Sequence, residues 1–110
     1  MDSTNYDKAA EFLTRLRGRR ALFVGNNNLL SLQYYLSGLD SGLWISGHEL
    51  PIRLATINRG WEWTSKGGFD QMEECGLTEE QRCLEAIDIY VDAFNLSRAS
   101  QDAGKSPFSN

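Results

Sequence analysis

The chain has 110 residues, 41% of them hydrophobic and 24% charged, which is enough for one globular domain and too few for two. This share of apolar side chains excludes a chain that is disordered throughout, and no apolar run approaches the length of a membrane span. The first residues lack the basic and apolar regions of a secretory signal peptide. We therefore expect a cytoplasmic protein that has no membrane contact.

The formal net charge of −4 is unevenly distributed along the chain. Residues 70–92 hold eight acidic residues and one arginine, which is a net charge of −7. Because a nucleic-acid-binding domain usually has a dominant basic face, this distribution argues against a nucleic-acid partner, although the arginines of residues 15–20 keep that alternative open. The acidic segment favours a cationic partner, while a solvated helix face would have the same composition.

The first half of the chain has the apolar periodicity of two helices, over residues 5–17 and residues 29–39. Gly38 and Gly42 are expected to end the second helix. Its buried face is predicted to consist of Leu29, Leu32, Leu36 and Leu39. The apolar run at residues 21–24 is too short for periodicity to decide between a strand and an extended connector.

The middle of the chain predicts two shorter helices. A helix over residues 51–57 begins at a proline and stops at Gly60, and residues 69–74 form another before the next glycine. Between these helices, Trp61 and Trp63 alternate with polar residues, which indicates a strand or an irregular segment.

The strongest local signal is the capping box Thr78-Glu79-Glu80-Gln81, which marks the start of a last helix. Glu85, Asp88 and Asp92 share one face of this helix. The opposite face is a broad apolar stripe of Cys83, Leu84, Ile87, Tyr90, Val91 and Phe94.

These elements predict an all-α, single-domain bundle of about four main helices. The domain is expected to span residues 1–98, with residues 99–110 as a flexible tail. The alternative is an α+β fold with a short two- or three-stranded sheet, built from residues 21–24 and a segment near Trp61 or Trp63.

No arrangement of residues in the sequence indicates catalysis. His48 is the only histidine and has no evident nucleophile or orienting partner. Cys75 and Cys83 match no zinc signature. We therefore expect no enzymatic activity, no cofactor and no metal site. An enzyme would have to use paired carboxylates such as Glu85 and Asp88.

The segment RGRRALFVGNNN (residues 17–28) has two interpretations. Its arginines and glycine, placed before a helix N-terminus, are compatible with a phosphate site. A simpler interpretation is a joint between helices, in which the arginines end the first helix and Asn28 caps the second.

A longer segment, LRGRRALFVGNNNLLSLQYYLSGLDSGLW (residues 16–44), resembles the opening of a group of small bacterial proteins. Their pattern is a helix, then Arg-Pro-(Ala/Gly)-(Leu/Met)-(Tyr/Phe)-(Val/Ile/Leu)-Gly, then a helix with spaced leucines that ends in glycine. The matching residues are Arg20, Leu22, Phe23, Val24, Gly25, Leu32, Leu36 and Gly38. Ala21 stands where the group has proline, and Gly60-Trp61 and residues 85–94 are similar to later landmarks of the group.

Such proteins resemble the immunity proteins encoded beside toxins of polymorphic or contact-dependent growth inhibition systems. The resemblance implies that the chain binds and neutralises a cognate toxin, and it supplies no catalytic residues. Since nucleases bind phosphates at cationic sites, we expect the partner to be a cationic nuclease domain whose active site or substrate surface the chain covers.

The residues predicted to contact this partner are Glu73, Glu74, Glu85, Asp88 and Asp92, with Trp61 and Trp63 as aromatic anchors. The alternative function is a small cytoplasmic adaptor or regulatory protein-binding module unrelated to toxins. In either case we expect a monomer or a weak dimer.

Overall fold

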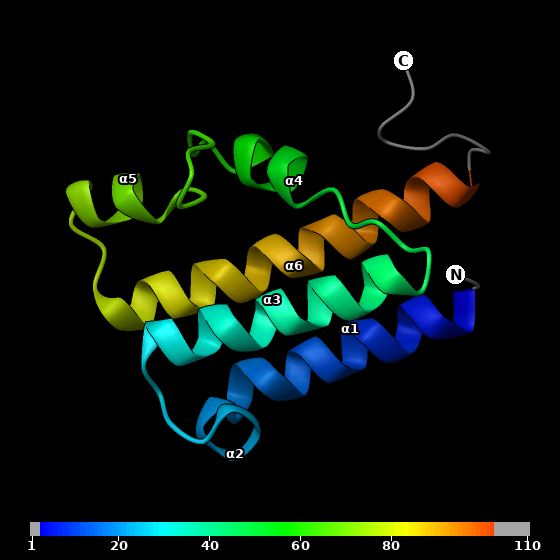
Figure 1. Ribbon diagram of the computed structural model, residues 1–110, viewed down its shortest axis with the longest axis horizontal. Helices are drawn as coiled ribbons and strands as arrows, with labels where there is room; N and C mark the ends of the chain where they lie inside the picture. The colour runs from blue at the N-terminus through cyan, green and yellow to red at the C-terminus, as the bar shows by residue number, and fades with distance from the viewer. Residues whose placement is uncertain (1–2, 103–110) are drawn as a thin grey trace.

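The computed structural model describes residues 3–102, and the described residues form an all-α fold (Figure 1). Three long helices run alongside one another, and a short helix joins the first two of them. Two more short helices lie against the third long helix, on its side away from the second. In chain order they are α1 (Ser3–Gly18), α2 (Arg20–Val24), α3 (Leu29–Ile45), α4 (Ile52–Asn58), α5 (Phe69–Glu74) and α6 (Glu79–Asp102).

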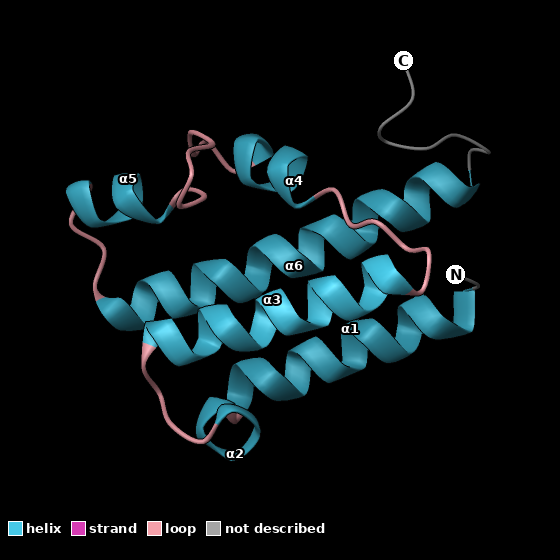
Figure 2. Ribbon diagram, in the orientation of Figure 1, coloured by secondary structure: helices cyan, strands magenta, loops and turns pink. Residues whose placement is uncertain are grey.

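The predicted all-α class is confirmed, and the α+β alternative is wrong. No strand occurs within residues 3–102 (Figure 2), where the β-type pairing is limited to an isolated bridge between Thr64 and Gly67. Residues 21–24, which the alternative fold assigned to a strand, belong to α2. This helix closes at Gly25, whose φ of 93° is the left-handed conformation that glycine adopts readily.

The core is organised around α6, because α1, α3, α4 and α5 all pack against it. The predicted capping box is present: the Thr78 hydroxyl accepts from the Gln81 backbone N–H at 3.1 Å, and the Gln81 side chain accepts from the Thr78 N–H at 2.8 Å. The fully buried side chains of the core include Leu13, Leu16, Leu32, Met72, Cys83 and Ile87. The predicted apolar stripe of α6 is therefore the centre of the molecule.

The predicted end of α3 is wrong, because the helix continues through Gly38 and Gly42 to Ile45. A glycine costs a helix interior about 1 kcal/mol relative to alanine. Leu43 lies beyond both glycines and is partly buried against the core, and full burial of a leucine side chain contributes about 2 kcal/mol. Partial burial of Leu43 thus offsets part of the cost of the glycines.

The last helix is longer than predicted. It continues through Asp102, beyond the domain boundary expected at residue 98. Residues 103–110 of the predicted tail lie outside the described residues.

The joint between α1 and α3 is held by Arg20, whose side chain is only 6% exposed. Its two Nη groups donate to the two carboxylate oxygens of Glu80 on α6, with an Nη1–Oε1 distance of 3.0 Å. Asn28 caps α3 as predicted, accepting from the Ser31 backbone N–H at 2.8 Å. The most buried arginine of this segment is therefore used to attach α2 to α6.

We predict that Glu80→Gln destabilises the protein at neutral pH. The hydrogen bonds from Arg20 hold the pKa of Glu80 below its ordinary value. The stability that Glu80 contributes is therefore present above its unfolded-state pKa and is lost as the pH falls through the lower folded-state pKa. Urea unfolding should give Glu80→Gln a lower free energy of unfolding than the native chain at pH 7, and the difference between the two should disappear at acid pH. Glu79→Gln is the control, and equal effects of the two substitutions would contradict the prediction.

Candidate functional site

The acidic stripe of α6, formed by Glu85, Asp88 and Asp92, is bound by two arginines of this chain. Arg59, the residue after α4, donates to Glu85 and, at 3.0 Å, to Asp92, and its Nη2 lies 3.8 Å from Asp88. Arg17 of α1 donates to Asp88 at 2.8 Å. The stripe thus attaches α1 and α4 to α6, and it offers a partner less free charge than the sequence indicated.

The remaining predicted contact residues lie apart from this stripe. Glu73 and Glu74 are exposed on α5, and Glu73 lies 3.8 Å from Arg82 of α6. Trp61 packs against the core, so close to Gly68 that a Cβ added there would lie 2.8 Å from the Trp61 Cβ. Trp63 is 42% exposed. Of the two tryptophans, Trp63 therefore has the larger surface free for a partner.

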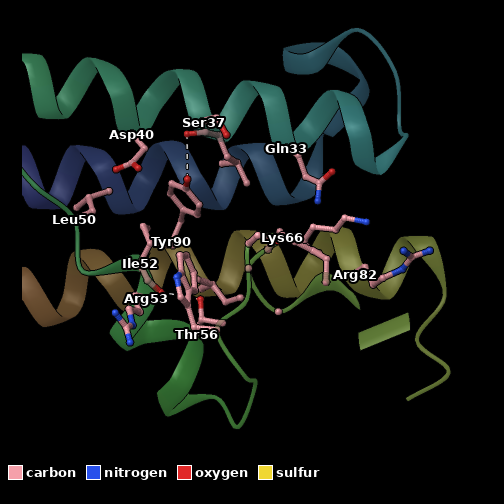
Figure 3. Close-up of a pocket in the computed structure, with 18 of the residues that line it drawn as sticks. Gln33, Ser37, Asp40, Leu50, Ile52, Arg53, Thr56, Lys66, Arg82 and Tyr90 are labelled. Carbon is pink, nitrogen blue, oxygen red and sulfur yellow. Dashed lines mark hydrogen bonds between the residues drawn. The ribbon is translucent and has the colours of Figure 1, made fainter. Parts of the chain in front are cut away.

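A groove that we did not predict lies between α3 on one side and α4, α5 and the loop between them on the other, with α6 as its floor (Figure 3). Its volume is about 1130 Å³. Five aromatic side chains line it, namely Tyr34, Trp44, Trp63, Phe69 and Tyr90. Glu73 and Trp63 are the predicted contact residues that also line this groove.

Tyr90 sets the separation of the floor from one wall of the groove. Its hydroxyl donates to the backbone carbonyl of Leu36 on α3 at 3.2 Å, shown as a dashed line in Figure 3. Burial raises the pKa of Tyr90 above its ordinary value, and the charge of Asp40 raises it further. The hydroxyl therefore stays protonated at physiological pH and continues to donate.

Charged groups are placed at the two ends of the groove. Figure 3 shows Asp40 and Arg53 at one end, and Lys66 and Arg82 with Gln33 at the other. The cations of the second end have carboxylate neighbours: Lys66 lies 4.0 Å from Asp70, and Arg82 lies 3.8 Å from Glu73.

The end near Asp40 differs, because its carboxylates lack such neighbours. Glu49 also lines this end. None of the ion pairs among the described residues involves Asp40 or Glu49. Burial raises the pKa of Asp40, and the charge of Glu49 adds to this shift. The ionised form of Asp40 is thus disfavoured in the free protein.

One sequence feature could have indicated the groove. In α3, Asp40 is the one charged residue, and large apolar side chains occur on several sides of the helix. A helix of this kind is normally buried all round. Here Leu30, Tyr34, Trp44 and Ile45 are all exposed. The signal was missed because the helix was expected to end before Trp44 and Ile45.

Other kinds of site find less support in residues 3–102. No three His, Cys, Asp or Glu side chains converge there as metal ligands would. Within the same residues, no helix has the length and apolarity needed to cross a membrane.

We predict that Arg59→Ala lowers the free energy of unfolding by about 2 kcal/mol, because hydrogen bonds to charged groups contribute amounts of this order and three carboxylates would lose their shared partner. The loss should shrink in ~1 M NaCl, which screens the remaining repulsion. Urea denaturation at neutral pH measures both effects. Arg19→Ala, at an exposed arginine near the start of α2, should stay near the native stability. If Arg59→Ala left the free energy of unfolding unchanged, the acidic stripe would not be what holds α4.

Comparisons of the chain with family models, with curated proteins and with solved structures found no match. The function is therefore inferred from the geometry of the groove, together with the motif in residues 16–44.

Proposed function

We propose that this chain is a binding protein that holds a segment of a partner polypeptide in the groove, and that it acts as an immunity protein by neutralising a toxin domain in this way. The observation that carries the binding role is the groove lined by five aromatic side chains beside α3, a helix with one charged residue. The toxin as partner rests on the resemblance of residues 16–44 to immunity proteins.

The size and lining of the groove favour a polypeptide as its occupant. Small-molecule pockets usually measure ~300–1,000 Å³ and enclose their ligand, whereas this groove of about 1130 Å³ is open between two helical walls. Tyrosine and tryptophan are enriched at the residues that dominate protein-protein affinity. Helices with an apolar face commonly bind in grooves of this kind.

The charges of the groove indicate the chemistry of the bound segment. Asp40 and Glu49 stand at the same end as Arg53, yet the structure gives neither carboxylate an ion pair among the described residues, and burial makes the charge of Asp40 unfavourable in the free protein. A lysine or arginine of the partner would relieve this cost on binding. We therefore expect an apolar segment that carries a basic side chain at that end, which suits a cationic toxin.

The acidic stripe of α6 then has a secondary part in binding. Arg17 and Arg59 already neutralise much of it. Its remaining charge, with the net charge of −4, would raise the rate of encounter with a cationic partner more than it would slow dissociation.

The proposal is tested by co-expressing the chain with any toxin-like product encoded beside it and measuring growth and affinity. We predict that Trp63→Ala weakens binding at least tenfold, because loss of an aromatic anchor costs about 2 kcal/mol, and that rescue of growth fails. Ile57→Ala is the matched control, since Ile57 is 45% exposed on α4 and lies outside the groove lining.

Other outcomes of this experiment would change either the proposed function or the proposed interface. Binding without protection from any toxic activity would indicate the adaptor alternative in place of an immunity protein. Binding that tolerates Trp63→Ala would reject the groove as the interface.

We further predict that Asp40→Asn stabilises the free protein at neutral pH and weakens partner binding. Because the folded state raises the pKa of Asp40, its ionised form costs stability above that pKa, and the cost disappears as the pH falls. Thermal unfolding should show a higher midpoint for the variant at pH 7 and a smaller gain at acid pH. Titration calorimetry with the partner should show lower affinity. Glu74→Gln is the control and should change neither the unfolding midpoint nor the affinity. Tighter partner binding by Asp40→Asn would contradict a role of Asp40 in binding a basic side chain.

A further inference from the structure

The outward side of α3 carries an apolar stripe that overlaps the groove only in part. At 100° per residue, Leu30, Tyr34, Gly38, Ser41 and Ile45 fall on one side of the helix. All five are exposed, and Trp44 flanks them with 68% of its surface free. Tyr34, Ser41 and Trp44 also line the groove, whereas Leu30, Gly38 and Ile45 do not. The stripe is therefore a second apolar surface that shares one edge with the groove.

We propose that a second copy of this chain covers this stripe, and that two α3 helices pack antiparallel about a two-fold axis. The stripe has its smallest residues, Gly38 and Ser41, between the larger Tyr34 and Ile45. An axis passing between the small residues would place Gly38 of each copy opposite Ser41 of the other, and Tyr34 opposite Ile45. A surface that matches itself on reversal is what a two-fold interface requires.

Electrostatics favours this face over others for self-association. Each copy carries a net charge of −4, so two copies repel each other in most orientations. The stripe itself has no charged residue, and Asp40, the one charge of α3, belongs to the groove side. Contact through the stripe therefore brings no like charges together.

The available area fits a dimer of modest affinity. Leu30, Tyr34, Trp44 and Ile45 are between 60% and 78% exposed. Taking ~150–250 Å² for each large side chain, their free surface is roughly 500 Å². Stable interfaces bury about 800 Å² per partner, and transient ones less. The exposed backbone around Gly38 adds to this area, and the total lies in the range of a transient, reversible dimer.

The test measures the oligomeric state of the full chain by sedimentation equilibrium, up to ~0.5 mM, where a micromolar dimer would be nearly complete. We expect a monomer–dimer equilibrium that Gly38→Gln weakens at least tenfold. A Cβ added at Gly38 meets no atom within 4 Å in the monomer, so this variant should fold while its side chain blocks close approach of the helices. Gly18→Gln, at another helical glycine with open space, is the matched control.

A second variant, Ile45→Lys, should also weaken the dimer tenfold, because it places a charge in the apolar contact. A native chain that stays monomeric at every concentration overturns the proposal, as does a dimer that tolerates both substitutions. Trp63→Ala should leave the dimer unchanged, and Gly38→Gln should not abolish growth rescue, so separate variants test the dimer and the groove even though Tyr34 and Trp44 belong to both surfaces. Loss of partner binding in Gly38→Gln without any native dimer would assign the stripe to the partner instead.

Discussion

Burial of one helix by its neighbours is the constraint on which the rest of the structure depends. Four other helices pack on α6, whose side chains at Cys83 and Ile87 are fully enclosed. Its acidic stripe would resist such packing if it were unpaired, because carboxylates held close together repel one another. Arg17 from α1 and Arg59 from the end of α4 remove most of this repulsion. The same contacts fix where those two helices lie.

The groove is a consequence of this shared support. The backbones of α3 and α4 both lie against α6 without packing on each other, so the space between them over α6 stays open. Tyr90 holds α3 at its distance from the floor, and Trp61 packed on Gly68 fixes the loop of the other wall. Both walls are thus attached by contacts already present in the free protein, and such preorganisation lowers the entropic cost of binding a partner.

Local signals determined much of the fold. The capping box at Thr78, the asparagine cap at Asn28 and the bounds of α5 were all predicted, because each depends on residues that are neighbours in the chain. The period of Leu29, Leu32 and Leu36 identified the buried face of α3 in the same way. Together these features were enough for the all-α class.

Contacts between distant residues determined the rest. The short run at residues 21–24 became a helix where Arg20 meets Glu80, and α3 passed through two glycines to a leucine, Leu43, that packs partly buried against the core. The acidic residues of α6 looked free since their arginine partners are far away in the chain. The groove was hidden for the same reason: a periodic pattern shows which face of a helix is apolar, while the identity of the helix that covers that face depends on packing between elements distant in sequence.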